Sequence, residues 1–118
     1  MPDEVAAGRD AALLLDMRLA ALEALAFVAG LDGAMFAGSR LHQNAVIRSL
    51  EVVGEAAGRV SSSFRARHPQ IPWRDITGMR NRLIHGYGDV RIEMVWMAAR
   101  DKLPELIAAL QPLIPPEA

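Results

Sequence analysis

The chain contains no cysteine, one tyrosine and a single lysine among its 118 residues. The lack of cysteine excludes disulfide bonds, thiolate metal sites and a cysteine nucleophile, and it suits a reducing compartment. No uninterrupted apolar run approaches the roughly 18 to 20 residues that a membrane span needs, because charged residues interrupt the first long apolar stretch. The first residues carry acids rather than bases, which is not typical of a signal peptide. We therefore expect a cytoplasmic protein with no membrane contact.

Charge is distributed unevenly along the chain. The formal net charge is only −1, but the segment 59–91 holds seven arginines against two acids, a local balance of +5. The planar guanidinium group of arginine is suited to bidentate contact with phosphate. The segment is therefore either a phosphate-binding surface or a solvated arginine-rich face, and charge alone leaves both interpretations open.

Apolar residues recur at helical spacing over nearly the whole chain, and no stretch alternates as a β-strand does. This periodicity predicts helices over 5–29, 41–64, 74–85 and 90–102, and a continuation over 104–110. Two prolines make 68–73 a loop. Gly54 and Gly58 lie four residues apart within a predicted helix, which indicates close backbone packing at that face.

The chain length predicts one domain over residues 1–118. The helical pattern predicts an all-α fold, an up-and-down bundle of four to five helices. Three prolines at 112, 115 and 116 predict that 111–118 is a frayed tail.

Three familiar types of site are disfavoured. The chain lacks the spaced lysine and hydroxyl residue of a Walker loop, and Gly86-Tyr87-Gly88 is too short for a dinucleotide fingerprint. His42, His68 and His85 have no neighbouring ligands at metal spacing, so we expect neither a metal nor a cofactor. The consecutive serines 61–63 have no adjacent base and are more typical of a helix end than of a nucleophile.

The stretch 80–87 is rich in groups that could act on a phosphodiester. On a helix, Asn81 and His85 are four residues apart and Arg82 and His85 are three apart, so these side chains share a face. Arg80 lies about 140° around the helix from His85, at about 100° per residue. Either the helix loosens at the glycine after His85, or a second copy of the chain brings its Arg80 toward that histidine across a two-fold axis.

Four blocks of the sequence, in order along nearly the whole chain, resemble the HepT family, also called the DUF86 proteins, of the HEPN superfamily: residues 44–48, 53–57, 71–76 and 78–87. The last block contains the most specific motif, an arginine (Arg80) and a polar residue, then three residues, a histidine (His85), any residue and a tyrosine (Tyr87). The resemblance implies an all-helical homodimer with this motif at its interface. It also implies a metal-independent ribonuclease that is the toxin of a toxin–antitoxin pair. In such pairs an MNT-type nucleotidyltransferase is the antitoxin and adenylylates the tyrosine, here Tyr87.

The chemistry of the residues agrees with a ribonuclease. RNA supplies its own nucleophile, the 2′-hydroxyl, so an enzyme needs to move protons and stabilise the pentacoordinate phosphate. Imidazole titrates near neutral pH, so His85 is the expected acid–base group, with one copy from each subunit. Arg80 is expected to hold the phosphate, and Asn81 to orient His85 or donate to a phosphate oxygen. Arg82 and Arg74 are expected to bind RNA.

Structural roles for some of these residues stay open. Asn81 could have a purely structural role as a turn or cap residue. Tyr87 could be a packing aromatic whose hydroxyl caps a backbone group. Trp73 is more typical of a core residue that fixes the start of a helix than of a base-stacking platform. The alternative function is a non-catalytic helical module that binds and regulates a nucleotidyltransferase. A purely structural oligomerisation domain is a third possibility.

Overall fold

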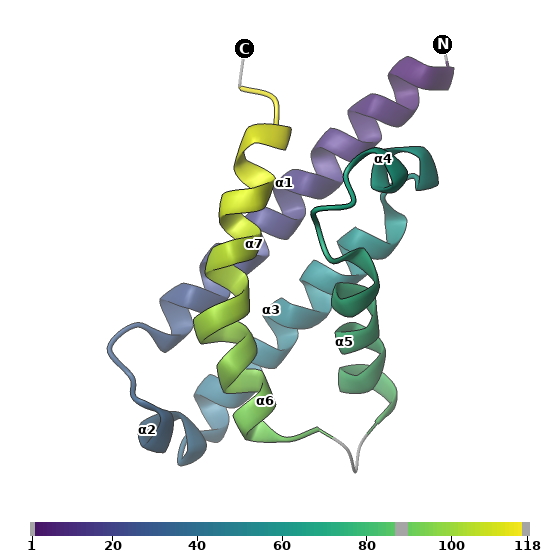
Figure 1. Ribbon diagram of the computed structural model, residues 1–118. Helices are drawn as coiled ribbons and strands as arrows, with labels where there is room; N and C mark the ends of the chain where they lie inside the picture. Colours follow the sequence, from purple (N-terminus) through teal and green to yellow (C-terminus); the bar gives the residue numbers. More distant parts are fainter. Residues whose placement is uncertain (1, 87–89, 117–118) are drawn as a thin grey trace.

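The computed structural model describes residues 2–86 and 90–116, and over these it contains helices and turns but no strand (Figure 1). The predicted all-α fold is confirmed. In chain order the elements are α1 (Pro2–Val28), α2 (Gly33–Ala37), α3 (Arg40–Arg59), α4 (Ser62–Arg67), α5 (Trp73–His85), α6 (Ile92–Met97), a π-helical turn (Ala98–Lys102), α7 (Leu103–Leu110) and a 3-10 turn (Gln111–Leu113). Within this described part, no helix is both long enough and apolar enough to cross a membrane.

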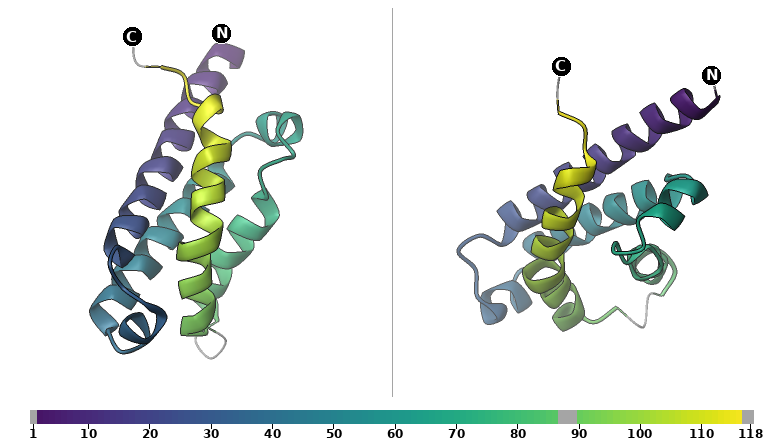
Figure 2. Two further views of the ribbon diagram at one scale, coloured as in Figure 1. Left: turned by 60° about the vertical axis from the view of Figure 1, so that its left-hand side comes forward. Right: turned by 45° about the horizontal axis from the view of Figure 1, so that its top comes forward.

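The long helices α1 and α3 pack along each other and form the centre of the bundle (Figures 1 and 2). Helix α5 packs against α3, and α7 packs against α1. The largest fully buried side chains come from five helices and from two positions between helices: Leu14, Met17, Phe36, Val46, Val60, Ile71, Val95 and Leu110. Burial of each such side chain stabilises the fold by about 1.5–3 kcal/mol. Helix α5 contributes the buried Trp73 and Leu83 to the same core.

The predicted helix over 41–64 is wrong at its end, because the chain breaks into α3 and α4 at Val60 and Ser61. Both residues have extended backbone. Asp10 of α1 is buried, and its carboxylate accepts hydrogen bonds from the Ser61 backbone N–H at 2.8 Å and from its hydroxyl at 2.6 Å. The same hydroxyl oxygen accepts from the Phe64 N–H at 3.2 Å and caps α4. A contact 51 residues away in the sequence therefore sets this helix boundary.

A second difference lies between α1 and α3, where α2 occupies a segment predicted as a connection. The Asp32 carboxylate accepts a hydrogen bond from the Met35 N–H at 2.8 Å and caps this short helix. The ring of Phe36 is buried and lies 5.2 Å from the ring of Trp96. Asp32 thus follows the end of α1 and also begins a new helix, which the contact of the buried Phe36 with the partly buried Trp96 holds in place.

The C-terminal region also differs from the expectation. The predicted helix over 90–102 is α6 followed by the π-helical turn, which ends two residues before Pro104. Proline has no backbone N–H to donate to the carbonyl four residues earlier, so a change of helical register at this point is reasonable. The frayed tail predicted over 111–118 is wrong in its first part, because Leu113 and Ile114 pack against the core. In addition, the Arg18 Nε donates to the Gln111 side-chain oxygen at 2.7 Å.

Candidate functional site

Helix α5 holds the predicted site residues, and Trp73 fixes its start. The Trp73 side chain is buried, and its indole N–H donates to the His68 carbonyl at 2.9 Å. The Phe64 ring meets it edge-on at a centroid distance of 6.3 Å. Trp73 therefore locks the preceding loop onto α4 and α5, which confirms its prediction as a core residue.

Helix α5 is regular as far as His85, and Gly86 ends it. The Gly86 N–H donates to the Arg82 carbonyl at 2.8 Å. A Cβ atom at position 86 would lie only 2.8 Å from that same oxygen, so glycine allows this close approach. The helix does not loosen before His85, and within one copy of the chain it does not rotate this histidine toward Arg80.

One side of α5 faces solvent along its whole length. We call the residues on it the outer stripe: Arg74, Gly78, Asn81, Arg82 and His85. All of them except Gly78 are exposed. Apart from its own helical turn and chain neighbours, no atom of the described residues lies within 4 Å of a Cβ built on Gly78. The structure thus places Asn81, Arg82 and His85 on one accessible side, together with Arg74.

The opposite side of α5 packs unusually closely on α3. A Cβ atom on Gly54 would overlap the Cβ of Arg80 and lie 3.2 Å from the Ile76 carbonyl oxygen. One turn further along α3, a Cβ on Gly58 would lie 3.7 Å from a Thr77 methyl group, which is ordinary contact. The close backbone packing predicted from these two glycines is confirmed, and it is tightest at Gly54.

Arg80 lies in this seam between α3 and α5 and is half-buried. Its Nε is enclosed and has no hydrogen-bond partner among the described residues. A buried donor without an acceptor costs about 1–3 kcal/mol, so the packing of α5 on α3 holds Arg80 in place against this cost. Arg80 and His85 therefore leave α5 on different sides, one in the seam and the other on the outer stripe.

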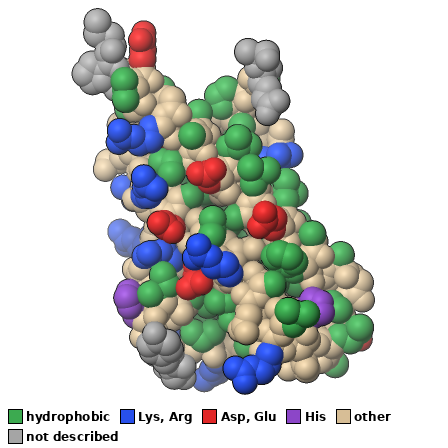
Figure 3. Space-filling model, turned by 180° about the vertical axis from the view of Figure 1, so that it is seen from behind, with side chains coloured by type: hydrophobic (Ala, Val, Ile, Leu, Met, Phe, Trp, Pro, Cys, Tyr) green, Lys and Arg blue, Asp and Glu red, His purple; other side chains and the backbone are tan. Residues whose placement is uncertain are grey.

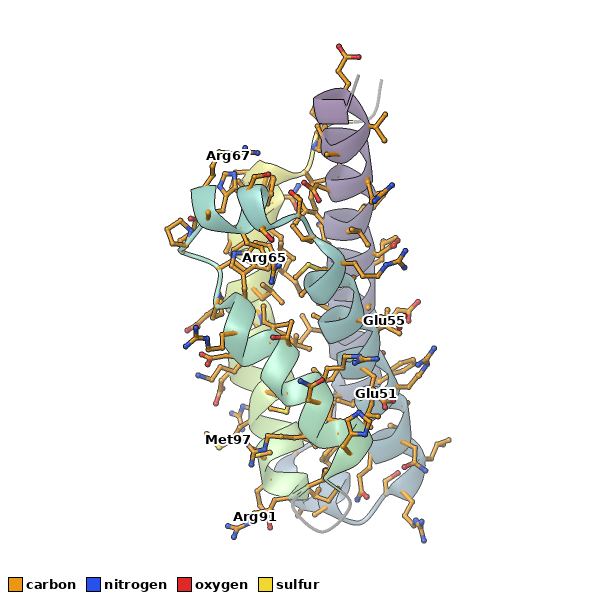
Figure 4. All side chains as sticks on the ribbon, turned by 90° about the vertical axis from the view of Figure 1, so that its right-hand side faces the viewer. Glu51, Glu55, Arg65, Arg67, Arg91 and Met97 are labelled. Carbon is orange, nitrogen blue, oxygen red and sulfur yellow. The ribbon has the colours of Figure 1, made fainter. Side chains whose placement is uncertain are left out.

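The other large concave surfaces have a different chemistry. A cleft of about 420 Å³ between α5 and α7 is mainly apolar, and none of the predicted site residues lines it. The groove between α1 and α3 is lined by charges of both signs: Asp16, Glu23, Glu55, Arg48 and Arg59. Figure 3 shows such interleaved acids and bases on the face seen from behind, and Figure 4 shows Glu51 and Glu55 beside α5. A polyanion fits the outer stripe better than this mixed groove.

Tyr87, the predicted modification site, lies outside the described residues, so its role stays a prediction. Arg65 of α4 was not singled out from the sequence, although its Nε is also enclosed without a partner in the described chain. Its only sequence signal is its place in the arginine-rich segment 59–91.

Comparisons with known proteins agree on one family. The model of the family "Ribonuclease HepT-like" matches residues 17–113. A protein of Methanocaldococcus jannaschii named "Putative RNase MJ1380" is 32% identical over 95 residues, which are 80% of this chain and 87% of the relative. A protein of Thermococcus cleftensis named "Probable ribonuclease HepT" is 42% identical over 64 residues, 54% of this chain and 58% of the relative. No solved structure matches the chain significantly.

Proposed function

The chain belongs to the HepT-like ribonuclease family, and we propose that it is a metal-independent endoribonuclease that acts as the toxin of a toxin–antitoxin pair. The main support is the accessible end of α5, where Asn81, Arg82 and His85 lie on one side. These residues belong to the family motif that begins at Arg80, and they fall within the matched residues 17–113.

The proposed reaction is attack by the RNA 2′-hydroxyl on the adjacent phosphorus. A neutral His85 accepts the proton of the 2′-hydroxyl, the new 2′-oxygen–phosphorus bond forms, and the bond to the 5′-oxygen breaks. A protonated His85 from a second subunit gives its proton to the departing 5′-oxygen. The products are a 2′,3′-cyclic phosphate and a 5′-hydroxyl. Proton transfer of this kind typically accelerates a reaction about 10²- to 10⁴-fold.

The proposed site is shared between two copies of the chain. Within one copy, Arg80 lies in the seam with α3 while His85 lies on the outer stripe. A two-fold axis near the end of α5 would bring Arg80 of one subunit to the phosphate that His85 of the other subunit acts on. Gly78 supports such an arrangement, because nothing within 4 Å occupies the space where its side chain would be and another backbone can approach there.

The proposed regulation is adenylylation of Tyr87 by an MNT-type nucleotidyltransferase, the antitoxin. The tyrosine hydroxyl attacks the α-phosphorus of ATP, pyrophosphate leaves, and AMP stays on the tyrosine. The added group carries negative charge and a bulky base two residues after His85. It would compete with the RNA phosphate and block access to the outer stripe.

The test is an RNA cleavage assay of the purified chain in the presence of a chelator. We expect 2′,3′-cyclic phosphate ends, and a loss of rate of about 10²- to 10⁴-fold for His85→Ala. His42→Ala is the matched control, because His42 lies on α3 rather than α5. Its Nδ1 shares a hydrogen bond of 2.6 Å with the hydroxyl of Ser39, which caps the same helix. Cleavage that needs added divalent metal and leaves a 3′-hydroxyl and a 5′-phosphate would refute the proposed chemistry.

The biological role is tested by expression of the chain alone. We expect growth arrest that His85→Ala abolishes and that the co-expressed nucleotidyltransferase prevents. If the unaltered chain is harmless and degrades no RNA, the alternative of a non-catalytic module that regulates the nucleotidyltransferase is favoured.

A further inference from the structure

A third concave surface lies at the start of α5, between α4, the loop that follows it and the first turns of α5. This cleft of about 540 Å³ is lined by two arginines, two hydroxyl side chains and three apolar residues: Arg65, Arg74, Ser62, Thr77, Pro69, Ile71 and Trp73. No acidic side chain is among these lining residues. We call this surface the α4–α5 cleft. Its composition suits an anion that also contacts apolar surface.

Arg65 gives the strongest indication that a ligand is bound there. Its Nε is enclosed by protein and has no acceptor among the described residues. Leaving such a donor unpaired costs free energy. Arg65 as a whole is only half-buried and lines the cleft, so a phosphate oxygen there can accept from the remainder of its guanidinium fork. Figure 4 shows Arg65 between α4 and α5, whereas Arg67 lies on the other side of α4. The Arg67 guanidinium is placed over the Phe64 ring at 5.8 Å and does not line the cleft.

The position of the cleft relates it to the proposed catalytic site. Arg74 lines the cleft and also begins the outer stripe that ends at His85. His85 comes eleven positions after Arg74 on α5, so the two residues are about 16 Å apart along the helix axis at roughly 1.5 Å per residue. A stacked strand with roughly 3.4 Å between phosphates spans this distance in about five nucleotides, and an extended strand needs fewer.

We propose that the α4–α5 cleft binds a backbone phosphate of the RNA several nucleotides away from the phosphate that is cleaved, with Arg65 and Arg74 as its ligands. The inference rests on the proposed function, because it takes RNA as the substrate. A protruding phosphate on a flexible single strand enters the α4–α5 cleft and reaches the Arg65 and Arg74 side chains that line it. The carboxylates on the surface of a folded acidic protein reach them less easily, so RNA is the favoured ligand. The contact reads no base, and it raises affinity for long RNA irrespective of sequence.

The test compares Arg65→Met with Arg67→Met in the full chain carrying His85→Ala, so that RNA is bound but not cut. Both changes remove one charge from α4, but only Arg65 lines the cleft. For a single-stranded RNA of about ten nucleotides we expect Arg65→Met to raise the Kd about tenfold, the lower end for a hydrogen bond to a charged group. The slope of log K against log salt should become shallower by about 0.7. A dinucleotide should bind equally to both variants, and Arg67→Met should change the Kd for the long RNA less than twofold.

Thermal unfolding separates binding from folding. Arg65→Met removes an unpaired buried donor, so the Tm of the variant without RNA should not fall. Equal effects of the two substitutions on RNA binding, or no effect of Arg65→Met, would overturn the proposal. If Arg65→Met leaves RNA binding intact but weakens co-purification of the nucleotidyltransferase, the cleft belongs to that protein partner. If inorganic phosphate raises the Tm of the protein that keeps Arg65 as much as RNA does, the cleft is a site for free anions. This result also contradicts the proposal.

The outcome is independent of the nuclease assay. Suppose that RNA binding depends on Arg65 but that the chain with His85 intact cuts no RNA. This result would support the cleft proposal and refute the proposed function. If the chain cleaves RNA but Arg65→Met leaves RNA binding unchanged, the proposed function is supported and the cleft proposal is refuted. Failure to bind RNA at all overturns the cleft proposal.

Discussion

The packing of α5 on α3 predicts opposite effects for the same substitution at two glycines. In Gly54→Ala the new methyl group overlaps the Arg80 Cβ and lies 3.1 Å from its Cγ and 3.2 Å from the Ile76 carbonyl oxygen. Because a backbone carbonyl cannot turn aside, the two helices must separate. In Gly58→Ala the new methyl group meets only the Thr77 methyl at 3.7 Å, so nothing has to move.

The magnitudes follow from two terms. Alanine is favoured over glycine in a helix by about 1 kcal/mol, which applies at both positions. Overpacking costs about 1–3 kcal/mol, and it applies only at Gly54. We therefore expect Gly58→Ala to stabilise the fold by about 1 kcal/mol and Gly54→Ala to destabilise it by about 1 kcal/mol. For a chain of this size, the Tm values of the two variants should differ by about 8 °C.

The assay is thermal or urea unfolding of both variants at equal concentration, together with RNA cleavage. Because Gly54→Ala displaces Arg80, its cleavage rate should also fall, and a displacement of about 1 Å can cost roughly 10²-fold. Gly58→Ala should keep its activity. If Gly54→Ala is as stable and as active as Gly58→Ala, the tight seam at Arg80 is wrong.

Three further substitutions test other parts of the structure. Asp10→Ala removes both hydrogen bonds to Ser61, at 2.8 Å and 2.6 Å, and should lower the free energy of unfolding by about 2–3 kcal/mol in urea titrations. The control Asp16→Ala, at an exposed position of α1, should change that free energy by less than about 0.5 kcal/mol. Gly86→Ala places a methyl 2.8 Å from a carbonyl oxygen of the last helical turn, so RNA cleavage should fall while the Tm falls little; unchanged kinetics would contradict this. Tyr87→Phe should still cleave RNA but escape neutralisation by the nucleotidyltransferase; full silencing would exclude this tyrosine as the control point.

The long helices were predictable from the sequence because their apolar residues recur regularly and their ends have clear turn residues. The break at Ser61 was not, because the carboxylate of Asp10 that causes it lies 51 residues away in the chain. For α2 the capping signal is local, since Asp32 accepts from the Met35 N–H, but a turn after α1 would use the same residues. The burial of Phe36 against Trp96, 60 positions further along the chain, is what the sequence did not show. Boundaries set by tertiary contacts leave no local pattern to recognise.

The site was predictable as far as helical geometry goes. The spacing of Asn81, Arg82 and His85 is enough to place them on one side of α5, and it separates Arg80 from them. The close approach at Gly54 was indicated only as a helix contact, because a single sequence does not show which helix lies opposite. Arg65 could not be distinguished from its neighbours, since its importance depends on an enclosed Nε and on a cleft formed by two helices.

The central claim is that the His85 ends of two α5 helices meet in one site. The chain has no cysteine, so His85→Cys introduces a thiol that a short bismaleimide can cross-link without interference. Glu105→Cys, at an exposed position of α7, is the control. At micromolar concentration we expect a covalent dimer in high yield for His85→Cys and little for the control. A chain that stays monomeric, or that cross-links no better at position 85 than at position 105, would contradict it.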